Sequence, residues 1–420
     1  MSAITLAALS LAGPVHARQD GGESIRGKME YVESGIREPV PGVMVMVTLE
    51  DEVVGTGVSD ETGAWQVPVP GPGAYRVEVL VDTLPEDIGL TDPERRVLTD
   101  VVVRSGQAKA VLFGLGPGLS GEQSAWSRIA GLVVIGLKFG AIIALAAIGL
   151  SLVFGVTGLV NFAHGDVVTL GAVLAFFFNA SKLGPGWHIL IAAVPAVLLT
   201  AGFGGAQEFL VWRPLRRRRT GLVSMLVISI GLAFAIRYLI LVAFEGLPRP
   251  YTEFVVQERI TLLGFSTVPK NLAIIGFTIL VLAGVGLFLQ KTRLGTAMRA
   301  VADNSDLAES SGIDVQRVIL ATWVVGSGLA GLGGVMFGLS EQVQWDMGFK
   351  LLLLIFAAVI LGGLGTAFGA MLGGFVIGVA VEMSTLVVPV EFKTVIALGL
   401  LVLMLLVRPQ GLLGSRERIG

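Results

Sequence analysis

The chain carries a series of long apolar runs, and this feature limits its fold more than any other. A run of about 20 apolar residues can cross the roughly 30 Å hydrocarbon core of a bilayer as a helix. With 53% hydrophobic and 15% charged residues, the composition is typical of an integral membrane protein. Long runs lie at about 128–154, 187–211, 221–244, 270–289, 318–340 and 390–407, and shorter ones at 167–180, 349–362 and 368–388.

The first 118 residues have a different character. Residues 1–17 contain a short apolar stretch that ends in Val15-His16-Ala17, which fits a signal peptide cleaved after Ala17; a disordered start is the alternative. Residues 18–118 alternate short β-branched runs with turn-forming residues, which predicts a small antiparallel β-sandwich. The predicted strands cover 43–49, 53–58, 65–69, 74–80, 96–103 and 109–112.

The expected fold is therefore an all-α polytopic membrane domain of eight or nine membrane segments, some broken or re-entrant, preceded by a small all-β sandwich. We expect a linker at 119–127, the membrane domain at 128–414 and a short tail at 415–420. The sandwich pattern, P-V-P-G-V-x-V-x-V followed by D-E-T-G-A-W and G-P-G-A-Y-R-V, resembles the carboxypeptidase-regulatory or transthyretin-like modules attached to extracytoplasmic proteins. That resemblance implies no catalysis by this part of the chain.

The basic residues of the loops predict the orientation of the chain. One set of loops carries twelve Lys or Arg residues, and the loops on the other side carry six, so the first set should be cytoplasmic. An extracytoplasmic sandwich with a cytoplasmic C-terminus requires an odd number of spans, which nine satisfies. The twelve are Arg213, Arg216, Arg217, Arg218, Arg219, Lys291, Arg293, Arg299, Arg317, Arg408, Arg416 and Arg418.

A polar segment, V-N-F-A-H-G-D-V from Val160 to Val167, interrupts two apolar runs. Polar backbone and charge are costly inside a bilayer unless they line a protected cavity or serve a function. Asn161, His164 and Asp166 are therefore candidate substrate-pathway residues, which could meet the ammonium or carboxylate of a solute. The alternative is structural: Asn161 and His164 cap the broken helix, and Asp166 lies at the cytoplasmic interface.

Three more ionisable residues lie within apolar runs: Lys138, Arg237 and Glu382. Each should face protein, water or lipid headgroups rather than hydrocarbon. Snorkelling or interfacial placement explains Arg237 and Glu382 most simply, although a pairing among the three is an alternative. Lys138, near the middle of the first span, joins the candidate pathway residues.

The longest cytoplasmic loop contains an amphipathic segment. Residues 296–310 place small apolar side chains on one face and charged ones on the other, which predicts a single short helix with Gly312 near its C-terminal cap. Such a helix can dock into a groove of another protein; a solvated connecting helix is the alternative. The candidate docking residues are Asp303, Asp306, Glu309 and Gly312.

Several function classes are disfavoured by the sequence. The chain has no Cys and only three scattered His, so we expect no metal site, and no cofactor or nucleic-acid motif occurs. It contains no G-x-x-x-x-G-K-[ST] phosphate loop, no G-x-S-x-G elbow and no H-E-x-x-H pair. We therefore expect a protein that is not an enzyme and that hydrolyses no ATP by the phosphate-loop route.

The motifs together resemble one family. The stretch G-L-S-L-V-F-G-V-T-G-L-V-N-F-A-H-G-D-V-V-T-L-G-A (149–172) resembles the hallmark of LivH-type permease subunits of ABC importers for branched-chain amino acids. The segment 295–315 looks like the coupling loop of such permeases. Further similar stretches are L-A-G-L-G-G-V-M-F-G, L-G-G-L-G-T-A-F-G-A-M-L-G-G and the terminal R-P-Q-G-L-L-G. The resemblance covers about residues 128–414, and the sandwich is a departure from the family pattern.

This resemblance implies an ATP-driven importer subunit in the cell (inner) membrane. Its expected partners are a second, similar permease subunit, two cytoplasmic ABC ATPases and an extracytoplasmic substrate-binding protein. Asp303, Asp306, Glu309 and Gly312 would then be coupling positions. Two alternatives stay open: a permease for urea or short amides, and an autonomous channel or carrier for a small polar solute. The sequence leaves the exact solute, the role of the sandwich and the pairing of membrane subunits undecided.

Overall fold

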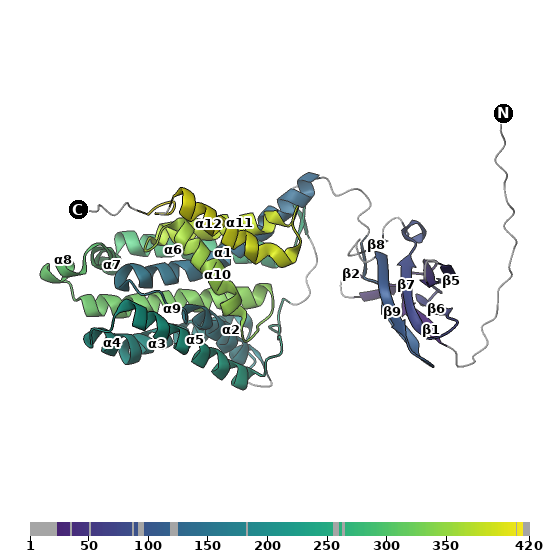
Figure 1. Cartoon of the computed structure of the whole chain (residues 1–420), viewed down its shortest axis with the longest axis horizontal. Helices are drawn as coiled ribbons and strands as arrows, with labels where there is room; N and C mark the ends of the chain where they lie inside the picture. The colour runs from purple at the N-terminus through teal and green to yellow at the C-terminus, as the bar shows by residue number, and fades with distance from the viewer. Residues whose placement is uncertain are drawn as a thin grey trace, which may run out of the picture. The chain divides into compact units, whose positions relative to one another are not determined.

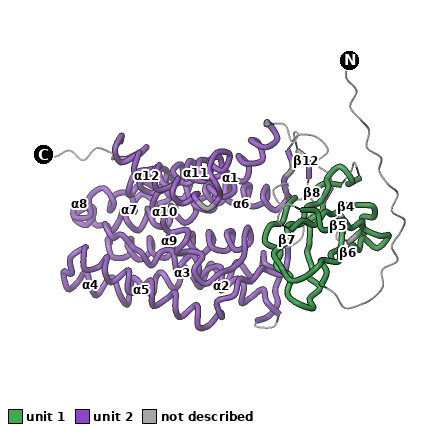
Figure 2. Tube along the Cα trace, turned by 45° about the vertical axis from the view of Figure 1, so that its right-hand side comes forward, with its two compact units in different colours: residues 1–123 green, residues 124–420 purple. Residues whose placement is uncertain are grey.

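The computed structural model divides the chain into two compact units, residues 1–123 and 124–420 (Figure 2). The boundary lies within the predicted linker. The predicted signal peptide (1–17) and tail (415–420) lie outside the described residues. The structure describes residues 23–33, 36–49, 52–85, 88–90, 96–117, 125–181, 184–254, 260–262, 265–408 and 410–414.

The first unit is built from short strands arranged in three small sheets. The sheet orders are β10-β1-β6, β3-β2-β11-β8 and β5-β4-β7-β9. The strands are β1 (Ser24–Lys28), β2 (Glu30–Glu33), β3 (Ile36–Pro39), β4 (Met44–Leu49), β5 (Glu52–Val58), β6 (Ala64–Pro68), β7 (Gly73–Val79), β8 (Ile88–Leu90), β9 (Val97–Val103), β10 (Ala108–Leu112) and β11 (Leu115–Pro117).

All six predicted strands are present, and their alternation explains the core. In β4, Val45 and Val47 point inward and are fully buried, as a strand with one buried face requires. They pack in a core with Trp65 and Tyr75. The expectation of a purely antiparallel sandwich is wrong at two pairings. Strand β1 pairs with β10 in parallel while pairing with β6 antiparallel, and β11 pairs with β2 in parallel.

The second unit is a helical bundle, which confirms the predicted polytopic membrane domain. Among the described residues, six helices are long and apolar enough to cross a membrane, and three shorter apolar helices accompany them. The long spans are α1 (Ala125–Thr157), α3 (Ile189–Gln207) continued by η3 (Glu208–Trp212) and α4 (Arg213–Arg217), α5 (Leu222–Phe244), α6 (Pro269–Lys291), α9 (Val315–Ser340) and α11 (Ala367–Ser384); the short helices are α2 (His164–Asn179), α10 (Met347–Gly362) and α12 (Lys393–Val407).

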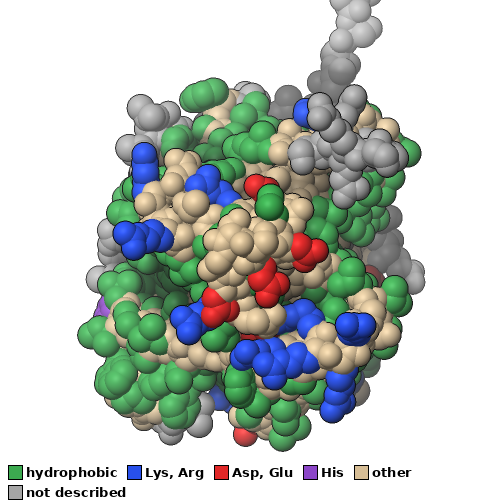
Figure 3. Space-filling view, turned by 90° about the vertical axis from the view of Figure 1, so that its left-hand side faces the viewer, with side chains coloured by type: hydrophobic (Ala, Val, Ile, Leu, Met, Phe, Trp, Pro, Cys, Tyr) green, Lys and Arg blue, Asp and Glu red, His purple; other side chains and the backbone are tan. Residues whose placement is uncertain are grey.

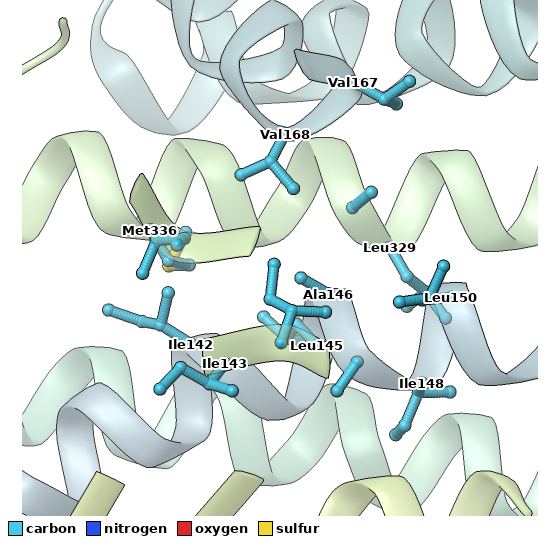
Figure 4. Packing of buried hydrophobic residues seen from close by; sticks show 14 of the residues in the cluster. Ile142, Ile143, Leu145, Ala146, Ile148, Leu150, Val167, Val168, Leu329 and Met336 are labelled. Carbon is cyan, nitrogen blue, oxygen red and sulfur yellow. The ribbon is translucent and has the colours of Figure 1, made fainter. Parts of the chain in front are cut away.

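Helix α1 lies at the centre of this bundle. It packs against α9 and α11, while α2 packs against α3, α9 and α10 (Figure 1). Figure 4 shows the buried apolar side chains between α1, α2 and α9, among them Leu145, Val168 and Met336. Because lipid is as apolar as these side chains, close packing rather than the hydrophobic effect must hold the helices together.

Glycines allow the central helices to approach backbone to backbone. A Cβ added at Gly171 of α2 would lie 2.4 Å from the Cα of Gly331 in α9, and one at Gly149 of α1 would lie 2.4 Å from the carbonyl oxygen of Gly326. Both positions leave no room for a larger residue. The high glycine content, 57 of 420 residues, therefore serves contact between helices at these points.

One end of the bundle carries the short polar helices. Helices α4, α7 (Arg293–Asp303) and α8 (Ser305–Ser310) lie together at this end in both overall views (Figures 1 and 2). We call it the basic end, because it also holds Arg216–Arg219, Lys291 and Arg293. The opposite end holds the β12–β13 hairpin (Ile260–Leu262 and Phe265–Thr267), which precedes α6.

Candidate functional site

The polar break between α1 and α2 is a segment of non-helical chain inside the bundle. Helix α1 ends at Thr157, Gly158 adopts a positive φ of 66°, and α2 begins only at His164. Glycine favours this left-handed conformation because it has no Cβ. The ring of His164 reaches the carbonyl of Ala146, eleven residues back from Thr157. Residues 158–163 therefore return alongside α1, and α2 starts within the depth of the bundle.

Side chains satisfy the backbone of this segment, as any non-helical chain at membrane depth requires. Thr157 Oγ1 accepts a hydrogen bond from the Leu159 amide at 3.2 Å. The Ser229 hydroxyl of α5 accepts one from the Phe162 amide at 3.1 Å. Asn161, which is fully buried, accepts one from the Ala163 amide at 3.0 Å through Oδ1.

His164 ties the start of α2 to α1. Its Nε2 lies 2.9 Å from the carbonyl oxygen of Ala146, so this nitrogen donates and carries the proton. The ring is 2% exposed and fills the space beside Gly149, where an added Cβ would lie 3.2 Å from the ring carbon Cε1. Asn161 and His164 thus both have protein partners in this structure.

Asp166 forms a buried ion pair with Arg237 of α5. Arg237 donates from Nε to Asp166 Oδ1 at 2.9 Å and from Nη2 to Oδ2 at 3.2 Å. Asp166 is fully buried and Arg237 is 6% exposed. The guanidinium also lies over the ring of Phe349, 3.8 Å from its centroid. Arg237 therefore does not snorkel toward lipid headgroups; it is buried in the bundle and paired with Asp166.

Lys138 lies apart from this group. It is 8% exposed in α1, about two helical turns (~12 Å) from Ala146. Among the described residues its ammonium has no hydrogen bond or ion-pair partner; it interacts electrostatically with Glu341 and Glu382 and with the cations Lys270 and Lys393. Glu382 in turn forms an ion pair with Lys393 at 2.8 Å. The suggested pairing among Lys138, Arg237 and Glu382 is therefore absent from the described residues.

The predicted docking segment consists of two helices rather than one. Asn304, with φ −160° and ψ 106°, ends α7 and begins α8, and its side chain accepts a hydrogen bond from the Leu307 amide at 2.9 Å. This N-cap geometry breaks the helix expected over 296–310. Asn is a favoured N-cap residue, so Asn304 was a signal for this break in the sequence. The apolar periodicity continues across it and predicted one helix instead.

Gly312 completes the turn after α8. It adopts a φ of 87°; its amide donates to Glu309, and the next amide, of Ile313, donates to Ala308. This pair of hydrogen bonds is a Schellman motif, in which glycine relieves the strain of the left-handed residue. The prediction that Gly312 caps the C-terminal end of this helix is therefore confirmed.

The two helices divide their faces as the sequence predicts. Met298, Val301 and Ala308 are buried against the bundle, whereas Asp303, Asp306 and Glu309 are exposed. Figure 3 views the basic end and shows acidic side chains gathered at its centre with Lys and Arg side chains around them. The exposed surface of α7 and α8 is therefore an acidic patch within a basic surround.

Comparisons with known proteins decide the family. The sequence profile described as "Branched-chain amino acid transport system / permease component" matches residues 132–405. The high-affinity branched-chain amino acid transport system permease protein BraD of Pseudomonas aeruginosa is 34% identical over 293 residues, covering 68% of this chain and 95% of BraD. The chain belongs to this permease family. LivH of Escherichia coli K12 is 33% identical over 295 residues, covering 67% of this chain and 94% of LivH.

The family predicted from the motifs is thus confirmed, and the chain is a multi-pass membrane protein. A second permease protein of the same system in Escherichia coli K12, LivM, is 25% identical over 293 residues, covering 63% of this chain and 66% of LivM. No solved structure matches the chain. The family profile begins at residue 132, after the sandwich.

Proposed function

We propose that this chain is a membrane subunit of an ATP-driven importer for branched-chain amino acids. Family membership supports the solute class, since BraD and LivH are named as permeases for these amino acids. The chain would act with a second permease subunit, two ABC ATPases and an extracytoplasmic binding protein. It would be a transport subunit and not an enzyme, with energy supplied by the ATPases.

The observation that carries this proposal is the acidic patch on α7 and α8. Asp303, Asp306 and Glu309 are exposed on a segment whose other face is anchored by buried Met298 and Val301. An anchored helix pair of this kind can transmit a push from a bound partner to α6 and α9, the spans that it connects. We infer that the ATPases dock here and that the basic end is cytoplasmic, in keeping with its excess of Arg and Lys.

We further propose that the break between α1 and α2 borders the translocation pathway. Asn161, His164 and Asp166 would contribute chiefly by fixing where α2 begins, because each already has a protein partner. Lys138 would present a buried ammonium toward a solute carboxylate, because no hydrogen-bonding partner occupies it among the described residues.

Reversal of two patch charges tests the proposal. The complex reconstituted in liposomes with its ATPases and binding protein should import labelled leucine only when ATP is supplied. Asp303→Lys with Asp306→Lys should abolish most of this uptake, since like charges would replace attraction at the docked surface. The chain should still insert into the membrane and fold.

A matched charge reversal controls for net charge. Glu61→Lys with Asp82→Lys changes two exposed acids of the sandwich and should leave uptake unchanged. Normal uptake by the patch variant would refute the docking assignment. Flux of leucine, urea or an amide through the purified chain alone, without ATP, would refute the importer and favour an autonomous channel.

A further inference from the structure

The helix that leads to the basic end widens by one turn of π-helix. Helix α3 continues through η3 into α4, and Pro214 lies near the start of α4. Residues four apart lie on one side of a helix, so this segment presents two neighbouring rows. One row is Phe209, Arg213 and Arg217, and the other is Leu210, Pro214 and Arg218.

The six residues of the two rows line one surface pocket with a volume of about 490 Å³. Each row begins with an exposed apolar side chain and ends with an arginine. Phe209 is 58% and Leu210 is 69% exposed, and both lie on the side of the pocket nearer the middle of the bundle. The pocket is therefore apolar toward the membrane interior and cationic toward the end of the helix.

Among the described residues, the three arginines of the pocket form no ion pair, although Arg213 interacts electrostatically with the buried Glu208. Arg216 lies on another face of the segment and forms a double ion pair with the buried Glu208. Within the described ranges, Arg213, Arg217 and Arg218 have no ion-pair partner. The Nε of Arg213 is buried and without a hydrogen-bond partner there, and its guanidinium lies 6.0 Å from the ring centroid of Phe209.

We propose that this pocket binds an anionic phospholipid. The guanidinium groups of Arg213, Arg217 and Arg218 would hold the phosphate, for which arginine offers paired donors. Phe209 and Leu210 would pack along the first carbons of an acyl chain. A free phosphate would use only the arginines, so the two exposed apolar residues favour the lipid. Basic pockets at the ends of membrane helices are suited to anionic headgroups.

The proposal is independent of the transported solute and of the docking assignment. The opposite face of the same segment contacts α9. There Trp212 stacks on Trp323, with 5.7 Å between the ring centroids. A headgroup that holds the π-helical turn in place would also hold the contact between this segment and α9, the helix that follows the acidic patch.

Lipid binding by the purified full-length chain tests the proposal. Native mass spectrometry in detergent would measure binding of phosphatidylglycerol, with phosphatidylcholine as the zwitterionic comparison and inorganic phosphate as the headgroup without chains. We expect phosphatidylglycerol to bind far more tightly than phosphatidylcholine. Arg217→Gln with Arg218→Gln should weaken its binding by roughly 30-fold.

The matched control removes two other cations of the same end. Arg219 and Lys291 are exposed and outside the pocket, so Arg219→Gln with Lys291→Gln should change phosphatidylglycerol binding by less than about threefold. Phe209→Ala should weaken the binding of phosphatidylglycerol but leave any binding of inorganic phosphate unchanged. If the double glutamine variant is unfolded by circular dichroism, Arg217→Lys with Arg218→Lys replaces it; this variant keeps the charge and should still lose several-fold affinity.

Four results would overturn the proposal. The first is equal loss of binding in the pocket and control variants, which would indicate attraction by overall charge alone. The second is equal binding of phosphatidylglycerol and phosphatidylcholine. The third is competition by inorganic phosphate that displaces the lipid completely with no effect of Phe209→Ala, which would indicate a free-anion site. Cross-links from Arg217 to another protein subunit that persist in excess phosphatidylglycerol would likewise exclude the lipid.

Discussion

Asp166 and Arg237 show what a single sequence can and cannot predict about a polar residue in a membrane. That both need a partner follows from the cost of a charge in hydrocarbon. Which partner each finds depends on α2 and α5 meeting across 71 positions of sequence, and no local pattern contains that information. The sequence did indicate the alternative in which Asn161 and His164 satisfy the broken helix, and their bonds to Ala163 and Ala146 agree with it.

The ion pair predicts a large loss of stability when one partner is removed. Arg237→Leu leaves the Asp166 carboxylate buried and unpaired, so we expect a loss of about 3–5 kcal/mol. Asp166→Asn combined with Arg237→Gln removes both charges and should cost clearly less. The apparent melting temperature of the purified chain in detergent measures both effects.

An exposed ion pair provides the comparison. Arg317 and Asp314 form a pair whose side chains are 87% and 50% exposed, and Arg317→Leu should cost no more than about 1 kcal/mol. An Arg237→Leu chain as stable as the wild type would contradict the buried pair.

Among the elements, the long apolar helices were predictable and the breaks within them were less so. Residue ranges of the predicted runs agree with α1, α5, α6 and α9 to within a few positions, because apolar length determines a membrane helix. The division between α7 and α8 depends on the backbone of Asn304. The parallel pairing of β1 with β10 joins segments more than 80 residues apart, and short polar strands such as β1 carry little periodicity.

Contacts between glycines predict which helices cannot move apart or accept side chains. Gly171→Ala would place a Cβ 2.4 Å from the Cα of Gly331, so α2 and α9 must separate. We expect a cost of about 1–3 kcal/mol, as for other overpacked sites, seen as a lower apparent melting temperature.

A glycine without near neighbours is the control. A Cβ at Gly231 in α5 would meet no atom within 4 Å; Gly231→Ala should therefore be neutral or stabilise the chain by up to about 1 kcal/mol through helix propensity. Equal melting temperatures for the two alanine variants would show that the α2–α9 contact is looser than described.

At the scale of the whole molecule, the described residues of the sandwich and of the helical bundle form hydrophobic cores that share no residue. The core of the sandwich includes Trp65 and Tyr75; the bundle contains a main core and a smaller cluster that includes Trp212 and Trp323. The division into two kinds of domain was evident in the sequence from the change of composition near residue 118. What the sandwich does was not evident, because strand patterns report a fold and carry no site.

The separate cores predict that the membrane domain works without the sandwich. The family profile matches only residues 132–405. The alignment with BraD covers 95% of BraD but only 68% of this chain. A chain in which residues 18–118 are deleted should therefore insert and assemble with its partners. Its orientation should be kept, because the arginines of the 213–219 loop remain to direct it.

Uptake of labelled leucine by cells that produce the deleted chain should stay within about twofold of the full-length chain, after correction for the amount in the membrane by immunoblot. The Asp303→Lys, Asp306→Lys chain supplies the level expected when coupling is lost. If the deleted chain reaches the membrane in normal amount but leucine uptake falls to that level, the sandwich is part of the transport mechanism, for example as a docking site for the binding protein. If uptake is kept, the sandwich serves a purpose separate from the passage of solute, because the helices alone then contain the pathway, the coupling segment and the contacts that hold them together.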